Sequence, residues 1–190
     1  MPIPSDIERE PIHTRTLSMN AYRRSDGLFD IDGHLRDTKP YDSVMPDNTI
    51  PAGQAIHDMW VRLTVNTEGE VVDARAHMDV GPHFTCEEIA PNYRRRVGLK
   101  LSRGWNRGVR ERLGGIAGCT HLTEMLGQMA TTALQALWGE IEMAAHARGE
   151  TLPLDPRVLN ACHTYREDGV FVKEFFSDHF RPADDGERHG

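Results

Sequence analysis

Two stretches in the first half of the chain alternate between apolar and polar residues, which is the pattern of half-buried β-strands. The first pair of runs flanks Asp26-Gly27 in TRTLSMNAYRRSDGLFDIDGHLRD, and Asp-Gly between such runs favours a tight hairpin turn. Counted by twos, one face of each run is apolar: Leu17, Met19 and Ala21, then Phe29, Ile31 and Leu35. The pattern therefore predicts a β-hairpin with one buried face.

A second hairpin is predicted in HDMWVRLTVNTEGEVVDARAHM, with its turn at Glu68-Gly69. Its apolar face combines two sets of alternate residues: Met59, Val61, Leu63 and Val65, then Val72, Ala74, Ala76 and Met78. The opposite faces of both hairpins carry charged side chains such as Asp30, Asp32 and Arg62. One apolar and one charged face indicate an antiparallel sheet that is covered on one side only.

A long helix is predicted from Thr120, which suits an N-cap, to about Gly149, which suits a helix end. Apolar residues recur at helical spacing from Leu122 to Ala144. Residues 125–139 include no charged side chain, and a helix without charge is usually covered on most sides. We therefore expect it to lie across the sheet and to meet another element or a second subunit, which favours a homodimer.

These elements predict an α+β fold, with an antiparallel β-sheet built from two hairpins packed on a long α-helix. The segment GVFVKEFF near the C-terminus is predicted to add a strand. We expect a flexible segment at residues 1–12, a single domain at 13–180 and a disordered tail at 181–190.

The composition of the 190-residue chain narrows the class of protein. Its net charge of -7 argues against a nucleic-acid binder, which needs clustered positive charge. Its three cysteines are far apart and odd in number, unlike a secreted disulfide framework. Neither an apolar signal region nor a bilayer-spanning apolar run is present in the sequence. We therefore expect a cytoplasmic protein without nucleic-acid or membrane partners.

Four polar residues fall in the apolar register of the predicted strands, near the strand ends. They are Arg15 and Arg23 on the first strand, Asp37 on the second and His57 on the third. A polar group on a buried face needs a partner, because an unpaired one costs free energy. Fraying of the strand ends into water is the alternative; otherwise these side chains rim a pocket between sheet and helix.

The start of the long helix, GCTHLTEM, brings further reactive groups to the same region. Cys119 and His121 stand at the helix N-terminus, where the macrodipole favours a thiolate and a neutral imidazole. Glu124 follows His121 by three residues and can share its face. A buried structural cysteine with a capping histidine is the alternative interpretation of this motif.

A zinc site is an open alternative, because the chain has several nitrogen and sulfur ligands. The candidates are His57, Cys86, Cys119, His121, Cys162 and His163. Their spacing matches none of the compact zinc motifs such as C-x-x-C or H-E-x-x-H. A zinc-dependent enzyme would have to assemble His57, Cys119 and His121 from distant segments.

Four motifs resemble a bacterial family catalogued as DUF2889: YRRSDGLFDIDGHLRDTK, GQAIHDMWVRLTV, GCTHLTEML and LNACH. The resemblance runs from about His13 to His163. It implies an association with bacteria that degrade aromatic compounds, and with lyases that release formaldehyde from lignin-derived phenolic dimers without a cofactor.

The resemblance and the polar residues together define a hypothetical lyase site. His57 or His121 takes the proton of a departing hydroxymethyl group, and Asp37 or Glu124 orients a histidine. Tyr22 and Arg23 hold the phenolate, and Arg15 and Cys119 complete the set that binds the aromatic substrate. A non-catalytic binding or assembly protein is the third hypothesis, with the uncharged helix as its contact surface.

Overall fold

The computed structural model describes Ile3 and residues 6–183. The predicted flexible segment (1–12) and disordered tail (181–190) fall partly outside this range, at residues 1–2, 4–5 and 184–190. The chain divides into two compact units, Met1–Glu140 and Ile141–Gly190. The predicted single domain at 13–180 stays a prediction. No helix among the described residues is long and apolar enough to cross a bilayer.

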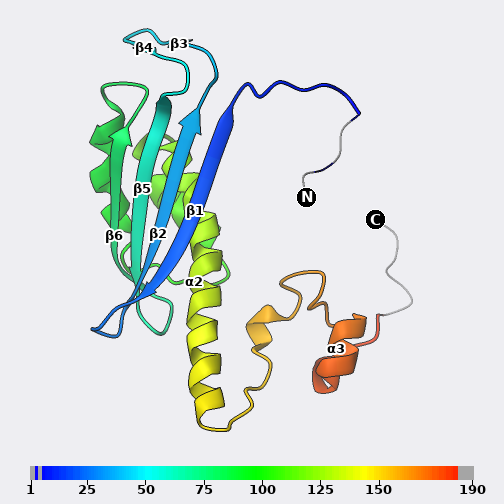
Figure 1. Ribbon diagram of the computed structural model, residues 1–190. Coiled ribbons are helices and arrows are strands. Elements are labelled where there is room, and N and C mark those ends of the chain that lie inside the picture. Colours follow the sequence, from blue (N-terminus) through cyan, green and yellow to red (C-terminus); the bar gives the residue numbers. More distant parts are fainter. Residues whose placement is uncertain (1–2, 4–5, 184–190) are drawn as a thin grey trace. The chain divides into compact units, whose positions relative to one another are not determined.

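The first unit is built around a four-stranded antiparallel sheet in the order β1-β2-β5-β6 (Figure 1). The strands are β1 (Thr14–Arg23), β2 (Phe29–Thr38), β5 (Ala55–Val65) and β6 (Val71–Val80). Both predicted hairpins are present, and their turn glycines Gly27 and Gly69 have φ angles of 83° and 74°. Those angles lie in the left-handed region, where a residue with a Cβ atom is strained. The predicted α+β class is confirmed.

The alternating pattern predicts the buried face of β2 and β5 correctly, because Ile31, Leu35 and Leu63 have exposed fractions of 1% or less. On β6 the prediction is wrong at one position, since Val71 is buried while Val72 is 38% exposed. The ladder between β5 and β6 shifts register between Thr64 and Val65. This irregularity moves the start of β6 by one residue, which exchanges the two faces there.

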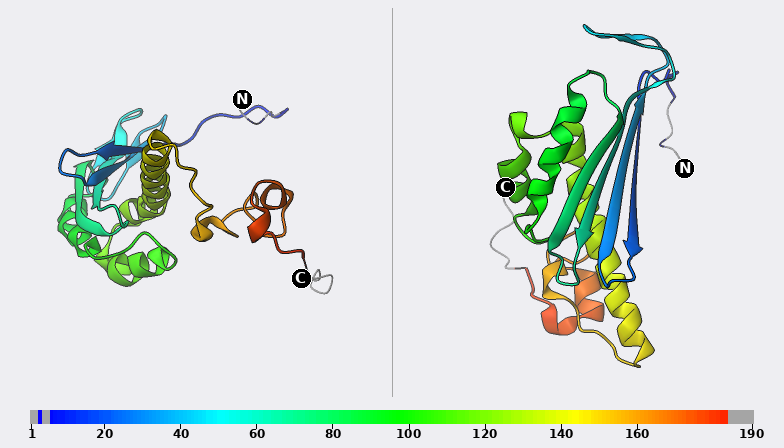
Figure 2. Two further views of the ribbon diagram at one scale, coloured as in Figure 1. Left: turned by 90° about the horizontal axis from the view of Figure 1, so that it is seen from below. Right: turned by 90° about the vertical axis from the view of Figure 1, so that its left-hand side faces the viewer.

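Helix α2 (Thr120–Ala147) closely matches the predicted long helix. Its apolar stripe, including Leu122, Leu126 and Met129, packs with the buried strand residues in one core. Helix α1 (Trp105–Leu113) joins the same core and covers the same face of the sheet (Figure 2). A Cβ atom on Gly33 of β2 would lie 2.8 Å from the sulfur of Met129. This glycine therefore lets α2 approach the sheet closely.

The other elements are short. In the first unit they are β3 (Ser43–Val44), β4 (Thr49–Ile50) and the 3₁₀ helices η1 (Cys86–Arg96) and η2 (Gly115–Ala117). In the second unit they are α3 (Val170–Phe175), η3 (Pro156–Val158) and η4 (Ser177–His179). The strand predicted in GVFVKEFF is wrong, because α3 occupies this segment. A short apolar run has too few residues for its period to separate helix from strand.

Candidate active site

The candidate site begins at Asp37, near the end of β2. Asp37 lies opposite Arg15 of β1 in one ladder and opposite His57 of β5 in the other. Arg15 donates two hydrogen bonds to the carboxylate, from Nε to Oδ1 at 2.8 Å and from Nη2 to Oδ2 at 2.7 Å. Nδ1 of His57 lies 2.9 Å from Oδ2. Because opposite residues in adjacent antiparallel strands share a face, the register alone brings these side chains together.

Asp37 is ionised in spite of its burial. Its side chain has no exposed surface. Burial acts to raise the pKa of the carboxyl, but hydrogen bonds from Arg15 and His57 outweigh burial and lower the pKa to about 2. A carboxylate can only accept hydrogen bonds, so Nδ1 of His57 must carry the hydrogen of their contact.

The hydrogen bond to Asp37 fixes the chemistry of His57. Burial lowers the pKa of this imidazole, as does the proximity of His121, while Asp37 acts in the opposite direction. His57 is therefore neutral near pH 7. With the hydrogen on Nδ1, its Nε2 carries a free lone pair that can accept a proton or bind a metal.

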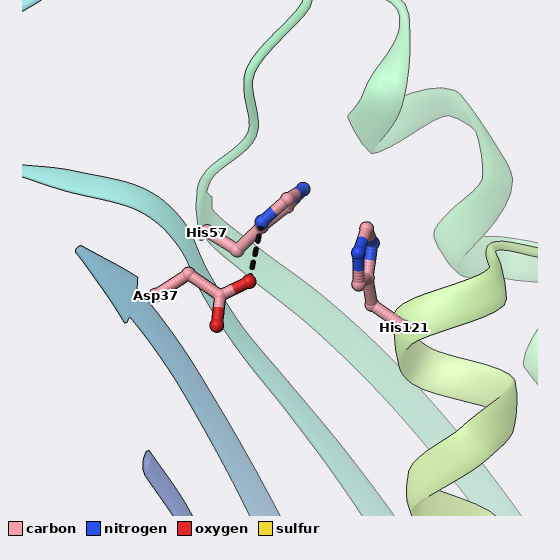
Figure 3. Close-up of side chains that lie close together, drawn as sticks. All are labelled: Asp37, His57 and His121. Carbon is pink, nitrogen blue, oxygen red and sulfur yellow. Dashed lines mark hydrogen bonds and ion pairs between the residues drawn. The ribbon is translucent and has the colours of Figure 1, made fainter. Parts of the chain in front are cut away.

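His121 comes to this place from the first turn of α2. Its ring centroid lies 4.0 Å from that of His57, with 43° between the ring planes, and Figure 3 shows the two rings facing each other. Burial lowers the pKa of His121, and the nearby Arg15 lowers it further. Sγ of Cys119 lies 3.9 Å from Nδ1 of His121. Two neutral imidazoles and a thiol thus meet beside one buried carboxylate.

Tyr93 of η1 contacts the start of α2 through its hydroxyl group. Its side chain is fully buried, and its hydroxyl accepts a hydrogen bond of 3.2 Å from the backbone N–H of Cys119. The same hydroxyl lies 2.9 Å from Oγ1 of Thr123 and 3.1 Å from the Cys119 carbonyl oxygen. Since the first N–H groups of a helix have no partner within the helix, this contact helps to fix the start of α2.

A cavity of about 490 Å³ opens beside these side chains. Asp37, His57, Cys119 and His121 line it on the polar side. Apolar lining comes from Ile56, Met59 and Pro82 among others. This volume lies within the range of roughly 300–1,000 Å³ that is usual for small-molecule sites, and the mixed lining is also typical of them.

The structure brings together six of the eight residues predicted for the site. They are Arg15, Asp37, His57, Cys119, His121 and Glu124. Glu124 is the most peripheral of them: its side chain is 62% exposed, and it lies 3.6 Å from Nη1 of Arg15. Among the described residues, no hydrogen bond joins Glu124 to either histidine. The structure therefore supports Asp37 rather than Glu124 as the group that orients a histidine.

Tyr22 and Arg23 are not part of this cluster. Arg23 lies eight residues after Arg15 on β1 and pairs with Glu140, at 3.0 Å. At ~3.3 Å per residue, that places it about 26 Å away along the strand. Tyr22 is half exposed and points to the opposite face, because neighbours on a strand alternate. Within one chain, neither residue can therefore reach a ligand that is bound beside Asp37.

Sequence reasoning missed His13 and Lys39, which also line the cavity. Nε2 of His13 lies 3.4 Å from Oδ1 of Asp37. A signal for His13 was present, because it stands two residues before Arg15 and so continues the same face. Lys39 follows the end of β2, where loop geometry cannot be derived from strand alternation.

Three side chains of the site could hold a metal ion. Ligand atoms of Asp37, His57 and His121 all lie within 4.8 Å of one another. Both oxygens of Asp37 already accept hydrogen bonds from Arg15, so this carboxylate is better placed to orient His57 than to bind a metal itself. Of the other predicted zinc ligands, Cys86 lines the cavity, whereas Cys162 and His163 belong to the second unit.

Comparison with known families places the cluster inside a shared domain. Residues 13–135 match the family described as "Protein of unknown function (DUF2889)". The chain belongs to this family. The match spans His13 to Gln135, so every residue of the cluster lies within the DUF2889 region, whereas the LNACH motif lies beyond it. No curated protein and no solved structure matches this DUF2889 protein.

Proposed function

We propose that this DUF2889 protein is an enzyme that acts on a small molecule by acid–base catalysis, with His57 as the general base. The observation that carries the proposal is the hydrogen bond of 2.9 Å between His57 and the buried carboxylate of Asp37. It fixes the tautomer and orientation of a neutral imidazole beside His121 and a cavity. An oriented base of this kind contributes typically 10²–10⁴-fold to a rate.

The specific reaction that we propose is cleavage of a carbon–carbon bond in a phenolic dimer, with release of formaldehyde. Nε2 of His57 accepts the proton of a hydroxymethyl group, the bond to that carbon breaks, and the carbon leaves as formaldehyde. The electron pair of the broken bond forms a carbon–carbon double bond as a hydroxyl departs from the adjacent benzylic carbon. That hydroxyl leaves as water, with the proton returned from His57 directly or through His121. The products are an alkene, formaldehyde and water, and no cofactor takes part.

The cavity fits this class of substrate in size and polarity. Its volume of about 490 Å³ accommodates aromatic rings, and Ile56 and Met59 provide apolar contacts. Arg15 and Lys39 line the same cavity and place positive charge where a phenolate would bind. The sequence assigned substrate binding to Arg15 together with Tyr22, Arg23 and Cys119, and we propose that Arg15 keeps this role. The size of the cavity also favours an enzyme over the non-catalytic binding protein of the third hypothesis.

Formaldehyde release from hydroxymethyl-bearing phenolic dimers tests the proposal. We expect turnover by the wild-type protein and a fall in kcat of about 10²–10⁴-fold in His57→Ala. His77→Ala is the matched control, because His77 pairs with an aspartate in the same way but lies 63% exposed on β6, outside the cavity. Undiminished turnover in folded His57→Ala and His121→Ala proteins would exclude this site as the catalytic centre.

A metal-dependent enzyme is the second candidate, favoured by the compact set of ligand atoms at Asp37, His57 and His121. In that case Nε2 of His57 and a ring nitrogen of His121 would bind the ion, and Asp37 would support His57 through Nδ1. Cys119, whose Sγ lies 3.9 Å from Nδ1 of His121, would be the further ligand that the sequence predicted. Elemental analysis of protein purified without added metal separates the candidates. One zinc ion per chain that is lost in His121→Ala supports the metal enzyme, and a metal content far below one per chain supports the cofactor-free base.

Two further expectations from the sequence, a cytoplasmic location and a homodimer, remain predictions beside this proposal. The homodimer bears on the site, because the sheet edge next to Arg15 offers a surface for a second chain.

A further inference from the structure

Strand β1 forms one edge of the sheet over its whole length. It pairs with β2 from Thr14 opposite Thr38 to Arg23 opposite Phe29, without a register shift. On its outer side, β1 has no strand partner in the described part of the chain. A long, regular edge of this kind presents backbone N–H and C=O groups to which another strand can bind.

The opposite edge of the sheet, strand β6, differs from the β1 edge in its backbone partners. Beside β6, the segment at residues 98–101 donates and accepts backbone hydrogen bonds with Gly69 and Val71, at 2.8 to 2.9 Å. The features that usually prevent edge pairing are proline, a β-bulge and outward charge. β1 contains no proline and no bulge, and its open face carries only uncharged side chains: Thr14, Thr16, Ser18, Asn20 and Tyr22. The β6 edge is thus paired with the chain at its first residue, whereas the β1 edge is open over its whole length among the described residues.

Helix α2 runs alongside β1 in the same direction. Two ion pairs connect them, Arg15 with Glu124 at 3.6 Å and Arg23 with Glu140 at 3.0 Å. The lengths agree, since eight strand residues span about 26 Å and sixteen helix residues span about 24 Å. The exposed and partly exposed side chains between the ion pairs are uncharged, and they are here called the β1–α2 band: Leu17, Met19 and Ala21 on β1 with Gln128, Thr131 and Gln135 on α2.

We propose that the outer edge of β1 and the β1–α2 band bind a second copy of this chain around a two-fold axis. Opposite residues in an antiparallel pair share a face of the sheet, so identical strands must pair residues of the same parity. With Met19 opposite Met19 on the axis, Leu17 faces Ala21 and Arg15 faces Arg23. Both copies then contribute β1 to one continuous eight-stranded sheet.

The charges at the two ends of the band suit this pairing. In the antiparallel arrangement, the Arg15–Glu124 pair of one chain lies beside the Arg23–Glu140 pair of the other. Each arginine then has a second carboxylate within reach, Glu140 of the partner subunit for Arg15 and Glu124 of the partner subunit for Arg23. The uncharged middle of the β1–α2 band then packs against the same band of the partner subunit. The surface is therefore complementary to itself, which is the requirement for a two-fold dimer.

The pairing also changes the candidate site. It places the partner's Arg23 next to Arg15, at the usual cross-strand Cα separation of about 5 Å. A second guanidinium would then lie at the rim of the cavity, available to a phenolate. This consequence rests on the proposed function, whereas the dimer itself can be tested without any substrate.

The oligomeric state in solution tests the interface. Multi-angle light scattering of the wild-type protein should give twice the chain mass of 21.4 kDa. Leu17→Lys should give the mass of one chain, because a lysine on an edge strand opposes pairing. Val72→Lys is the matched control, because Val72 is an apolar strand residue with a similar exposed fraction, 38% against 37% for Leu17, but lies on β6. A monomeric wild type, or a dimeric Leu17→Lys protein, overturns the proposal.

A cross-link gives a second test that tolerates an unstable Leu17→Lys variant. Met19→Cys places two thiols at the proposed axis, where antiparallel Cα separations of about 4.5–5.5 Å suit a disulfide. The variant is made in a Cys162→Ser background, because Cys162 is the exposed native thiol among the described residues. Oxidised glutathione should link Met19→Cys chains in pairs and leave Val72→Cys chains single. Equal cross-linking of the two variants, or none in either, contradicts the proposed axis.

Discussion

Among the described residues, Asp37 is the one buried carboxylate and His57 the one buried imidazole. A charged group in a protein interior needs compensation, and Arg15 provides it through two hydrogen bonds. The same carboxylate orients His57 and partly offsets the effect of burial on its pKa. At the scale of single residues, the site is therefore an ionised acid that holds a neutral base in place.

The effect of Asp37 on His57 leads to a prediction for the pH dependence of activity. Because the pKa of His57 is lowered from 6.5, its imidazole becomes protonated only below pH 6.5. The acid limb of the pH–rate profile, where activity is lost with protonation of the base, should therefore lie below pH 6.5. Asp37 raises the pKa of His57, so Asp37→Asn should move that limb to still lower pH. It should also reduce kcat/KM by about 10²-fold or more, through loss of orientation. Asp79→Asn, next to exposed His77, is the control in the pH–rate profile and should change neither quantity.

Arg15 should matter for stability more than an ordinary surface arginine. Arg15→Ala leaves the carboxylate of Asp37 buried without its main partner, and loss of one member of a buried pair costs about 3–5 kcal/mol. Since the Arg15 side chain is about one-third exposed, we expect the low end of this range, a loss of about 3 kcal/mol in the free energy of unfolding measured with urea at pH 7. Arg24→Ala removes exposed pairs with Asp26 and Asp30 and should leave the free energy of unfolding nearly unchanged. Equal effects of the two changes would contradict the description of Asp37.

At the scale of elements, the site depends on where α2 begins. Cys119 and His121 reach the ends of β2 and β5 because the first turn of α2 is fixed against η1. Tyr93 makes that connection, with a buried hydroxyl that accepts the N–H of Cys119. A shift of this turn would separate the two imidazole rings, since His57 belongs to β5 and His121 to α2.

Tyr93→Phe should loosen the start of α2 without emptying the core. The N–H of Cys119 loses its described partner, and an unsatisfied buried donor costs about 1–3 kcal/mol. We expect a loss of about 1–2 kcal/mol in unfolding free energy and faster hydrogen exchange at the Cys119 amide. Tyr41→Phe, at a half-exposed position, should change neither. Unchanged exchange at Cys119 in Tyr93→Phe would show that the hydroxyl does not hold the turn.

The elements themselves could be predicted where the pattern is long and regular. Burial alternates along all ten residues of β2 and from His57 to Leu63 in β5, and the apolar residues of α2 recur at helical spacing from Leu122 to Ala144. The pattern failed at Val72, because a register irregularity is a property of two paired strands and not of one. It also failed in GVFVKEFF, where six residues of α3 are too few to show a period.

At the scale of the whole molecule, the first unit joins residues that are far apart in sequence. The grouping of Arg15, Asp37 and His57 could be predicted, because all three occupy the apolar register at the same end of adjacent strands. The grouping with His121 required the packing of α2 on the sheet, which sequence pattern alone does not fix. Tyr22 and Arg23 lie apart from this group because nearness in a motif says nothing of distance along an extended strand.

The DUF2889 match ends at Gln135, within the first unit, and therefore includes the sheet, most of α2 and the whole cluster. The site thus lies within the part of the chain that matches the family. The second unit, from Ile141, carries Cys162 and His163 and lies outside the family match.

The most direct measurement is the titration of the histidine side chains by NMR, with ¹⁵N labels on both ring nitrogens. For His57 we predict a pKa below 6.5 and, in the neutral ring, a proton on Nδ1, because burial disfavours the charged form and Asp37 accepts that hydrogen. Asp37→Asn should lower this pKa further. A His57 pKa at or above 6.5, or a neutral ring with its proton on Nε2, would contradict a base that is held ready by Asp37.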